Sequence, residues 1–84
     1  MNITLKLFAS LTDYLPDHAR GDNQTSLEVA ADATVAQVIA SCALPEKLVH
    51  LVLINGSYVD PAHRPTQTLK DGDVLAIWPP IAGG

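Results

Sequence analysis

Hydrophobic and polar residues alternate over the first eight positions of the chain. A period of two residues is typical of a β-strand with one buried face, and it predicts a strand over residues 2–8, NITLKLF. The inward residues of this pattern are Ile3, Leu5 and Leu7. The same reasoning predicts strands over residues 25–30, TSLEVA, with Leu27 and Val29 inward, and over residues 74–78, VLAIW.

The period changes to that of a helix in the middle of the chain. Apolar residues there recur at i, i+3, i+4 and i+7, which is the stripe that an amphipathic helix buries. The stripe consists of Val35, Val38, Ile39 and Cys42. Asp32 or Thr34 can cap the N-terminus by accepting a hydrogen bond from a free backbone N–H,. Pro45 ends the helix or opens a second short turn through Leu48.

An apolar run at residues 50–59, HLVLINGSYV, predicts a β-hairpin. Asn55 and Gly56 tolerate the positive φ angles of a tight turn,. Ser57 to Val59 then form a short return strand, and the residues before and after the hairpin follow loop patterns. The longest predicted loop, residues 9–24, has one helical turn before Pro16,.

The predicted order is strand, strand, helix, strand, short strand, strand. One main helix for four or five strands predicts an α+β fold, in which the helix crosses one face of a mixed sheet. This order is that of a β-grasp, the arrangement of ubiquitin-like proteins. We assign residues 1–78 to this domain and residues 79–84 to a flexible C-terminal tail.

Composition limits the classes of function. The chain has 84 residues, which suffice for one core, and a net charge of −4, which disfavours binding to nucleic acid,. Cys42 is the single cysteine, so an intrachain disulfide and a four-cysteine cluster are excluded,. We expect a cytoplasmic protein without a signal peptide or a membrane span. His18, His50 and His63 have no metal-site spacing, so no metal is expected,.

The most unusual segment is the end, WPPIAGG. An α-carboxylate is a poor acyl donor and needs activation, for instance as a mixed anhydride with AMP. Gly83 and Gly84 have no Cβ, which lets the backbone approach a nucleotide closely,. Pro79 and Pro80 stiffen the exit from the last strand, and Ile81 and Ala82 follow them,. Residues 79–84 reach at most ~20 Å when extended, which is enough to bring the Gly84 carboxylate into a partner's active site.

Two aromatic residues have the parity of the solvent-facing side. Phe8 shares the parity of Lys6, and Trp78 shares that of Val74 and Ala76. The two rings lie together if the first and last strands are neighbours, and exposed aromatic patches mark docking sites. The alternative is that a bulge or a covering loop buries one of them.

Residues 69–84, LKDGDVLAIWPPIAGG, closely resemble the C-terminal signature of the MoaD/ThiS family of sulfur-carrier proteins. The resemblance also covers ITLKLFASL, TVAQVI and VLINGSYVD, and so nearly the whole chain. It implies a β-grasp fold. It also implies that a ubiquitin-activating-type (MoeB/ThiF-like) enzyme uses ATP to adenylate Gly84, which a sulfur donor protein then helps to convert to a thiocarboxylate.

The length and the PPIAGG tail look more like MoaD than ThiS. This resemblance implies the small subunit of molybdopterin synthase, which is not catalytic alone. Its tail enters the larger, MoaE-like subunit and donates sulfur to precursor Z in molybdenum cofactor biosynthesis. Family members dock through apolar residues of the sheet, a role that Phe8 and Trp78 match, although Trp78 stands where we expect phenylalanine.

Three other functions stay open at this point. The same tail could supply sulfur for thiamin, cysteine, tRNA thiolation or a tungsten cofactor. A ubiquitin-like modifier would join it to lysines through an isopeptide bond. A plain interaction module would carry an inert tail, and deletion of Gly83 and Gly84 would then change no activity.

Overall fold

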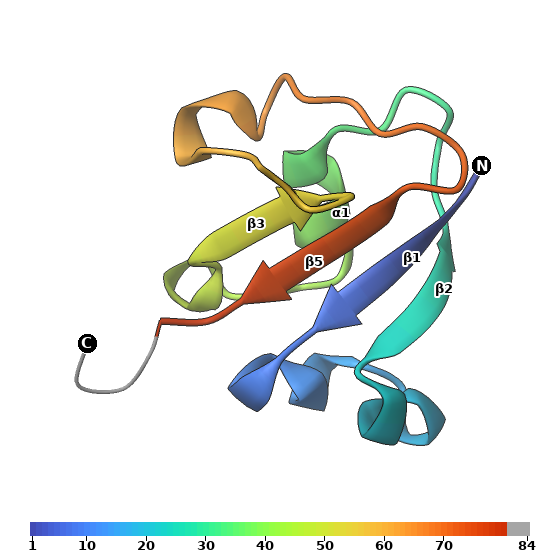
Figure 1. Ribbon diagram of the computed structural model, residues 1–84, viewed down its shortest axis with the longest axis vertical. Coiled ribbons are helices and arrows are strands. Elements are labelled where there is room, and N and C mark those ends of the chain that lie inside the picture. Colours follow the sequence, from blue (N-terminus) through green and yellow to red (C-terminus); the bar gives the residue numbers. More distant parts are fainter. Residues whose placement is uncertain (81–84) are drawn as a thin grey trace.

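Five strands form one mixed sheet within residues 1–80, the part of the chain that the computed structural model describes (Figure 1). Their order across the sheet is β2-β1-β5-β3-β4. The bounds are β1 Asn2–Leu7, β2 Gln24–Glu28, β3 Leu51–Ile54, β4 Ser57–Tyr58 and β5 Val74–Trp78. All five predicted strands are therefore confirmed: β5 has the predicted bounds, and the ends of the others differ by at most two residues.

The two central strands, β1 and β5, run parallel, and the other neighbours are antiparallel. Leu5 lies beside Leu75 across the central pair, and Val52 lies beside Ile77 in the next pair. All four side chains are fully or almost fully buried. The predicted inward parity of the first and last strands is thus confirmed, and it defines the buried face of the sheet.

Helix α1, Val35–Ser41, covers this buried face. The hydroxyl of Thr34 accepts a hydrogen bond from the Gln37 backbone N–H at 3.2 Å, and Gln37 Oε1 accepts one from the Thr34 N–H at 3.0 Å. This reciprocal pair is a capping box, so Thr34 rather than Asp32 caps the helix. After α1, Ala43 adopts a left-handed φ of 55°, and the Leu44 N–H bonds to the Ile39 carbonyl at 3.3 Å.

The helical stripe packs into the core as expected. Val35 and Val38 are buried, whereas Ile39 and Cys42 are half-buried against the core. Burial raises the pKa of the Cys42 thiol, and the hydrogen bond with Ser41 offsets only part of this rise. A thiol with a raised pKa is a poor nucleophile, which agrees with the interpretation of Cys42 as a small packing residue.

The segment between β1 and β2 is more regular than predicted. It forms two 3₁₀ helices, η1 Ala9–Tyr14 and η2 Asp17–Asp22. Leu11 in η1, Leu15 between the two helices and Ala19 in η2 enter the core, where each is less than 5% exposed. Two shorter 3₁₀ helices, η3 Glu46–Leu48 and η4 Pro61–His63, flank β3 and β4. The turn predicted through Leu48 is therefore confirmed as η3.

This helix across one face of a mixed sheet, with a parallel central pair, is the predicted β-grasp. No helix among the described residues is long and apolar enough to cross a membrane. Within residues 1–80, no three His, Cys, Asp or Glu side chains gather closely enough to hold a metal ion. The predicted assignments of Ile81, Ala82, Gly83 and Gly84 fall outside the described residues.

Candidate functional site

An aromatic stack lies at the end of the sheet from which the C-terminal residues leave. The ring of Phe8, directly after β1, and that of Trp78, the last residue of β5, have centroids 4.2 Å apart and planes 3° from parallel. Both side chains are half-buried. The prediction that the two rings lie together is therefore confirmed, and neither ring is covered completely.

Backbone hydrogen bonds fix the position of this stack. The Phe8 N–H donates to the Ile77 carbonyl at 3.3 Å, and the His50 N–H donates to the Trp78 carbonyl at 3.0 Å. The last residues of β5 are therefore held from both neighbouring sides. Ala9, with a left-handed φ of 53°, then turns the chain away from the stack into η1. The rings are placed by the sheet rather than by a mobile loop.

The stack continues into an apolar surface on the side of the sheet opposite α1. Trp78 lies beside Leu51, and Leu53 lies between Ala76 and Tyr58. We call this surface the apolar sheet face, formed by Phe8, Leu51, Leu53, Tyr58, Val74, Ala76 and Trp78. Tyr58 is 59% exposed and is the most exposed large hydrophobic side chain among the described residues.

Two features of this face were not predicted. Ala76 has the outward parity, yet it is only 7% exposed because its small side chain lies between Lys6 and Leu53 on the neighbouring strands. Leu53 and Tyr58 were not singled out as docking residues. The alternation of residues 50–59 indicates which side chains share a face, but the pairing partners of each strand are needed to show that Leu53 and Tyr58 belong to the apolar sheet face.

The first tail residues, Pro79 and Pro80, which we call the root of the tail, follow directly after the aromatic stack. Pro79 is buried and Pro80 is exposed, directly after Trp78. Neither proline can donate a hydrogen bond to a strand, so the ladder ends here. The predicted sites at Gly83 and Gly84 lie beyond the described residues, and their chemical role stays a prediction.

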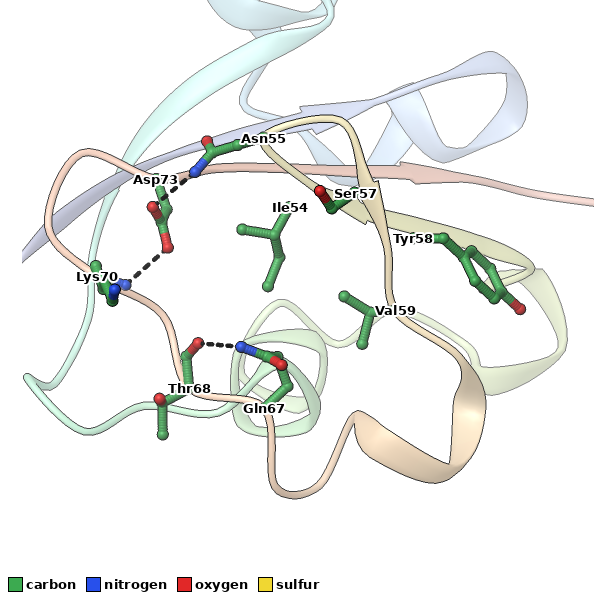
Figure 2. A pocket seen from close by; sticks show the side chains of 9 residues that line it. All are labelled: Ile54, Asn55, Ser57, Tyr58, Val59, Gln67, Thr68, Lys70 and Asp73. Atoms are coloured by element: carbon green, nitrogen blue, oxygen red, sulfur yellow. Dashed lines mark hydrogen bonds between the residues drawn. The ribbon is translucent and has the colours of Figure 1, made fainter.

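A polar hollow of about 330 Å³ lies beside β4, at the far edge of the sheet (Figure 2). Asn55 Nδ2 donates to Asp73 Oδ1 at 2.9 Å, and the Lys70 N–H donates to Asp73 Oδ2 at 2.8 Å. The Val74 N–H donates to Asn55 Oδ1 at 2.8 Å. These bonds tie the β3–β4 hairpin to the turn before β5.

Ionisable groups contribute little to the apolar sheet face. Of its seven residues, Tyr58 alone carries an ionisable side chain, and Lys6 borders the face beside Ala76. Elsewhere on the surface, His63 Nδ1 and Asp60 Oδ2 lie 2.7 Å apart, within hydrogen-bond distance. The hydrogen bond from His63 holds the pKa of the Asp60 carboxyl below its usual range. The face is therefore suited to burial against another protein rather than to acid–base chemistry.

Comparison with known proteins places the chain in a family. The sequence model of the ThiS family matches residues 5–84. No curated protein matches the chain significantly. Among solved structures, SAMP1 from Haloferax volcanii is 26% identical, with full coverage of both chains and a TM-score of 0.69.

Two further structures share the fold. The putative molybdopterin converting factor, subunit 1, from Pyrococcus furiosus is 22% identical, with 96% of this chain and 99% of that chain covered and a TM-score of 0.71. A chain from the complex of subunits 1 and 2 of the molybdopterin-converting factor of Helicobacter pylori 26695 is 22% identical, with full coverage of both chains and a TM-score of 0.60. Because the family match spans all but the first four residues, this β-grasp protein belongs to the ThiS family.

Proposed function

We propose that the chain is a sulfur carrier whose working group is the carboxylate of Gly84. The family match runs to residue 84 and so includes the whole PPIAGG ending. An activating enzyme of the MoeB/ThiF type uses ATP to convert the carboxylate to an acyl adenylate. A persulfide on a donor protein then attacks the acyl carbon and AMP leaves. A second thiol cleaves the resulting acyl disulfide, which forms a disulfide with the donor sulfur and releases the thiocarboxylate of Gly84.

The observation that carries this proposal is the position of the Phe8–Trp78 stack at the root of the tail. A partner that covers the apolar sheet face lies next to the point where residues 79–84 begin. Those residues span at most ~20 Å. Docking on the face thus brings Gly84 within reach of the partner's active site, which supplies the acid–base groups that the face lacks.

The partner that we propose for sulfur delivery is a larger, MoaE-like subunit of molybdopterin synthase. The fold shared with molybdopterin converting factor subunit 1, and with a chain of the complex of subunits 1 and 2, supports this choice. In this assembly the chain is not catalytic alone. Its thiocarboxylate donates sulfur to precursor Z within the larger subunit, and hydrolysis returns the free carboxylate for another cycle.

Reconstitution tests the proposed pathway. The thiocarboxylated chain is mixed with the larger subunit and precursor Z, and formation of the dithiolene is followed. We expect product in proportion to the thiocarboxylate added and none with the carboxylate form. If the loaded chain gives no dithiolene but supplies sulfur for thiamin, cysteine, tRNA thiolation or a tungsten cofactor, the carrier chemistry stands and the molybdenum pathway is wrong.

The similarity to SAMP1, a small archaeal modifier protein, favours a second candidate function. In that case the activated Gly84 is joined to lysine side chains of other proteins through an isopeptide bond. An epitope-tagged chain expressed in its own cells would then give ladders of larger species on denaturing gels. Their loss on deletion of Gly83 and Gly84, with retention of the monomer, identifies conjugation through the tail.

A further inference from the structure

Apart from the apolar sheet face, the molecule exposes the outer edge of strand β2. This strand ends the sheet on one side, and within residues 1–80 its outer edge pairs with no other strand. Figure 1 shows β2 at the margin of the sheet and α1 behind the middle of the sheet. The opposite edge is shorter, because β4 has only two residues. An unpaired strand edge presents backbone donors and acceptors that can pair with another chain.

The register shows which groups of β2 face outward. In an antiparallel pair, each residue directs both its backbone groups either toward the partner strand or away from it, in alternation. Val29 exchanges backbone hydrogen bonds with Met1, each at 2.8 Å, so the residues of this parity face β1. The alternate residues, Gln24, Ser26 and Glu28, therefore direct their N–H and C=O groups to the open edge. All three are exposed.

A groove lies between the C-terminal end of β2, the loop that follows β2, and α1. It measures about 430 Å³, and its apolar lining includes Val29, Ala33 and Val38. An extended segment added to β2 places every second side chain on the α1 side of the sheet. Those side chains would enter the groove, while the side chains between them point to the other face, where the side chain of Glu28 lies.

The charge around the groove selects the partner. The residues around the groove include the acids Glu28 and Asp32, both exposed, and none of them is basic. The carboxylate of Glu28 lies on the sheet face opposite α1, where it can meet the intervening side chains of an added strand. The N-terminal ammonium of Met1 is nearby but already donates to the Val29 carbonyl at 2.8 Å. A second copy of this chain, with its net charge of −4, is disfavoured here by like-charge repulsion,. A segment with basic residues is favoured.

We propose that the open edge of β2 and its groove bind an extended, basic peptide segment of a partner protein by β-strand addition. In this mode, main-chain hydrogen bonds provide affinity and side-chain pockets provide selectivity. The inference goes beyond the proposed sulfur transfer, because β1 separates β2 from β5 and the root of the tail. A partner at β2 can therefore bind while the apolar sheet face is occupied.

The probe is a blocked peptide of alternating valine and lysine, titrated into the isotope-labelled full chain. We expect amide shifts at Gln24–Glu28 and along α1, with little change in β5. Affinity falls as salt is added, because the charges are at the surface. A valine–glutamate peptide of the same length binds at least about tenfold more weakly, and N-methylation of the peptide amides that face β2 abolishes binding.

Ser26→Pro tests the edge on the protein side. Its N–H faces outward, so proline removes a donor to the peptide without removing a bond to β1. We expect about tenfold weaker binding, consistent with the loss of a hydrogen bond and of close backbone approach. Glu28→Gln weakens binding about threefold at low salt, and the matched control Glu46→Gln, outside the groove, leaves it unchanged. If Ser26→Pro fails to fold, the N-methylated peptide makes the same test.

Three results overturn the inference: no amide shifts, shifts confined to the apolar sheet face, or equal affinity for acidic and basic peptides. Self-association that Ser26→Pro abolishes would assign the edge to a second copy instead. Thiocarboxylate formation, measured on the same Ser26→Pro variant, is expected to be normal. Failure of peptide binding is thereby distinguished from failure of the sulfur-carrier proposal.

Discussion

Replacement of Trp78 by alanine separates a docking role from a core role. Trp78 is half-buried and stacks on Phe8 at 4.2 Å. A fully buried aromatic residue changed to alanine costs ~3–5 kcal/mol, and an aromatic pair contributes ~0.5–1.5 kcal/mol beyond its buried area. For a half-buried ring, we expect the free energy of unfolding to fall by about 2 kcal/mol. In a domain of this size, this lowers the melting temperature by about 8–16 °C.

The loss of binding should be larger than partial unfolding explains. If Trp78 is a docking residue, its truncation weakens association with the larger subunit by at least ~2 kcal/mol, or about 30-fold in Kd. Titration calorimetry at a temperature where the variant is fully folded measures this loss of binding free energy. Thr34→Ala is the control, because loss of the helix cap costs ~1 kcal/mol of stability far from the apolar sheet face and should leave Kd unchanged.

A double-mutant cycle with Phe8→Ala isolates the stack itself. We expect a coupling of about 0.5–1.5 kcal/mol in the free energy of unfolding, as for other aromatic pairs. A much larger loss of stability for Trp78→Ala, together with normal binding by the folded fraction, would contradict a docking role for Trp78. Trp78 would then be a core residue, and the docking face would have to lie elsewhere.

Other residues give independent tests. Ala43 holds a left-handed φ of 55° after α1, which costs a non-glycine residue ~1–2 kcal/mol; Ala43→Gly should therefore raise the free energy of unfolding by about 0.5–1 kcal/mol, and an unchanged or lower value argues against strain there. The hydrogen bond with His63 lowers the pKa of Asp60, so it adds stability that is present above the unfolded-state pKa and lost as pH falls through the folded-state pKa. His63→Asn should therefore raise the titration midpoint of the Asp60 carboxyl measured by NMR. An unchanged midpoint would show that the two side chains do not interact in solution. Gly83→Val should stop ATP–pyrophosphate exchange with the activating enzyme without changing the circular dichroism, and normal exchange counts against a narrow channel.

Strand parity and helix period predicted most of the fold correctly, because each pattern indicates directly which side chains are buried. Ile3 and Val38 were placed correctly in this way. The choice between Asp32 and Thr34 as cap could not be made from residue type, since both carry suitable oxygens. It is decided by spacing, because Gln37 stands at the third helical position from Thr34 and completes the capping box.

The segment after β1 shows what a local pattern misses. Leu11, Leu15 and Ala19 are spaced four residues apart, but Pro16 and the polar residues between them favour a loop. Their burial depends on the end of the sheet, which offers them a surface on which 3₁₀ turns can pack. Tertiary contacts of this kind override local propensity and are not encoded in any single window.

The candidate site was predictable to the extent that it depends on parity. Phe8 and Trp78 could be placed on one face from their own strands, and the parallel pairing of β1 with β5 then brought them together. Tyr58 and Ala76 required more, because exposure on a sheet is set by the neighbouring strands. The large, exposed ring of Tyr58 lies on an edge strand, whereas the small Ala76 is shielded in the centre.

The intact mass of the chain after incubation with its activating enzyme, ATP and a sulfur source tests the central claim most directly. We expect a mass gain equal to the replacement of one oxygen by one sulfur, located on Gly84 by fragmentation and absent without ATP. A variant with one alanine added after Gly84 should keep its fold and show no gain. An unchanged mass for the native chain in the presence of a competent activating enzyme, or an equal gain in the extended variant, would show that the Gly84 carboxylate is not the sulfur-carrying group.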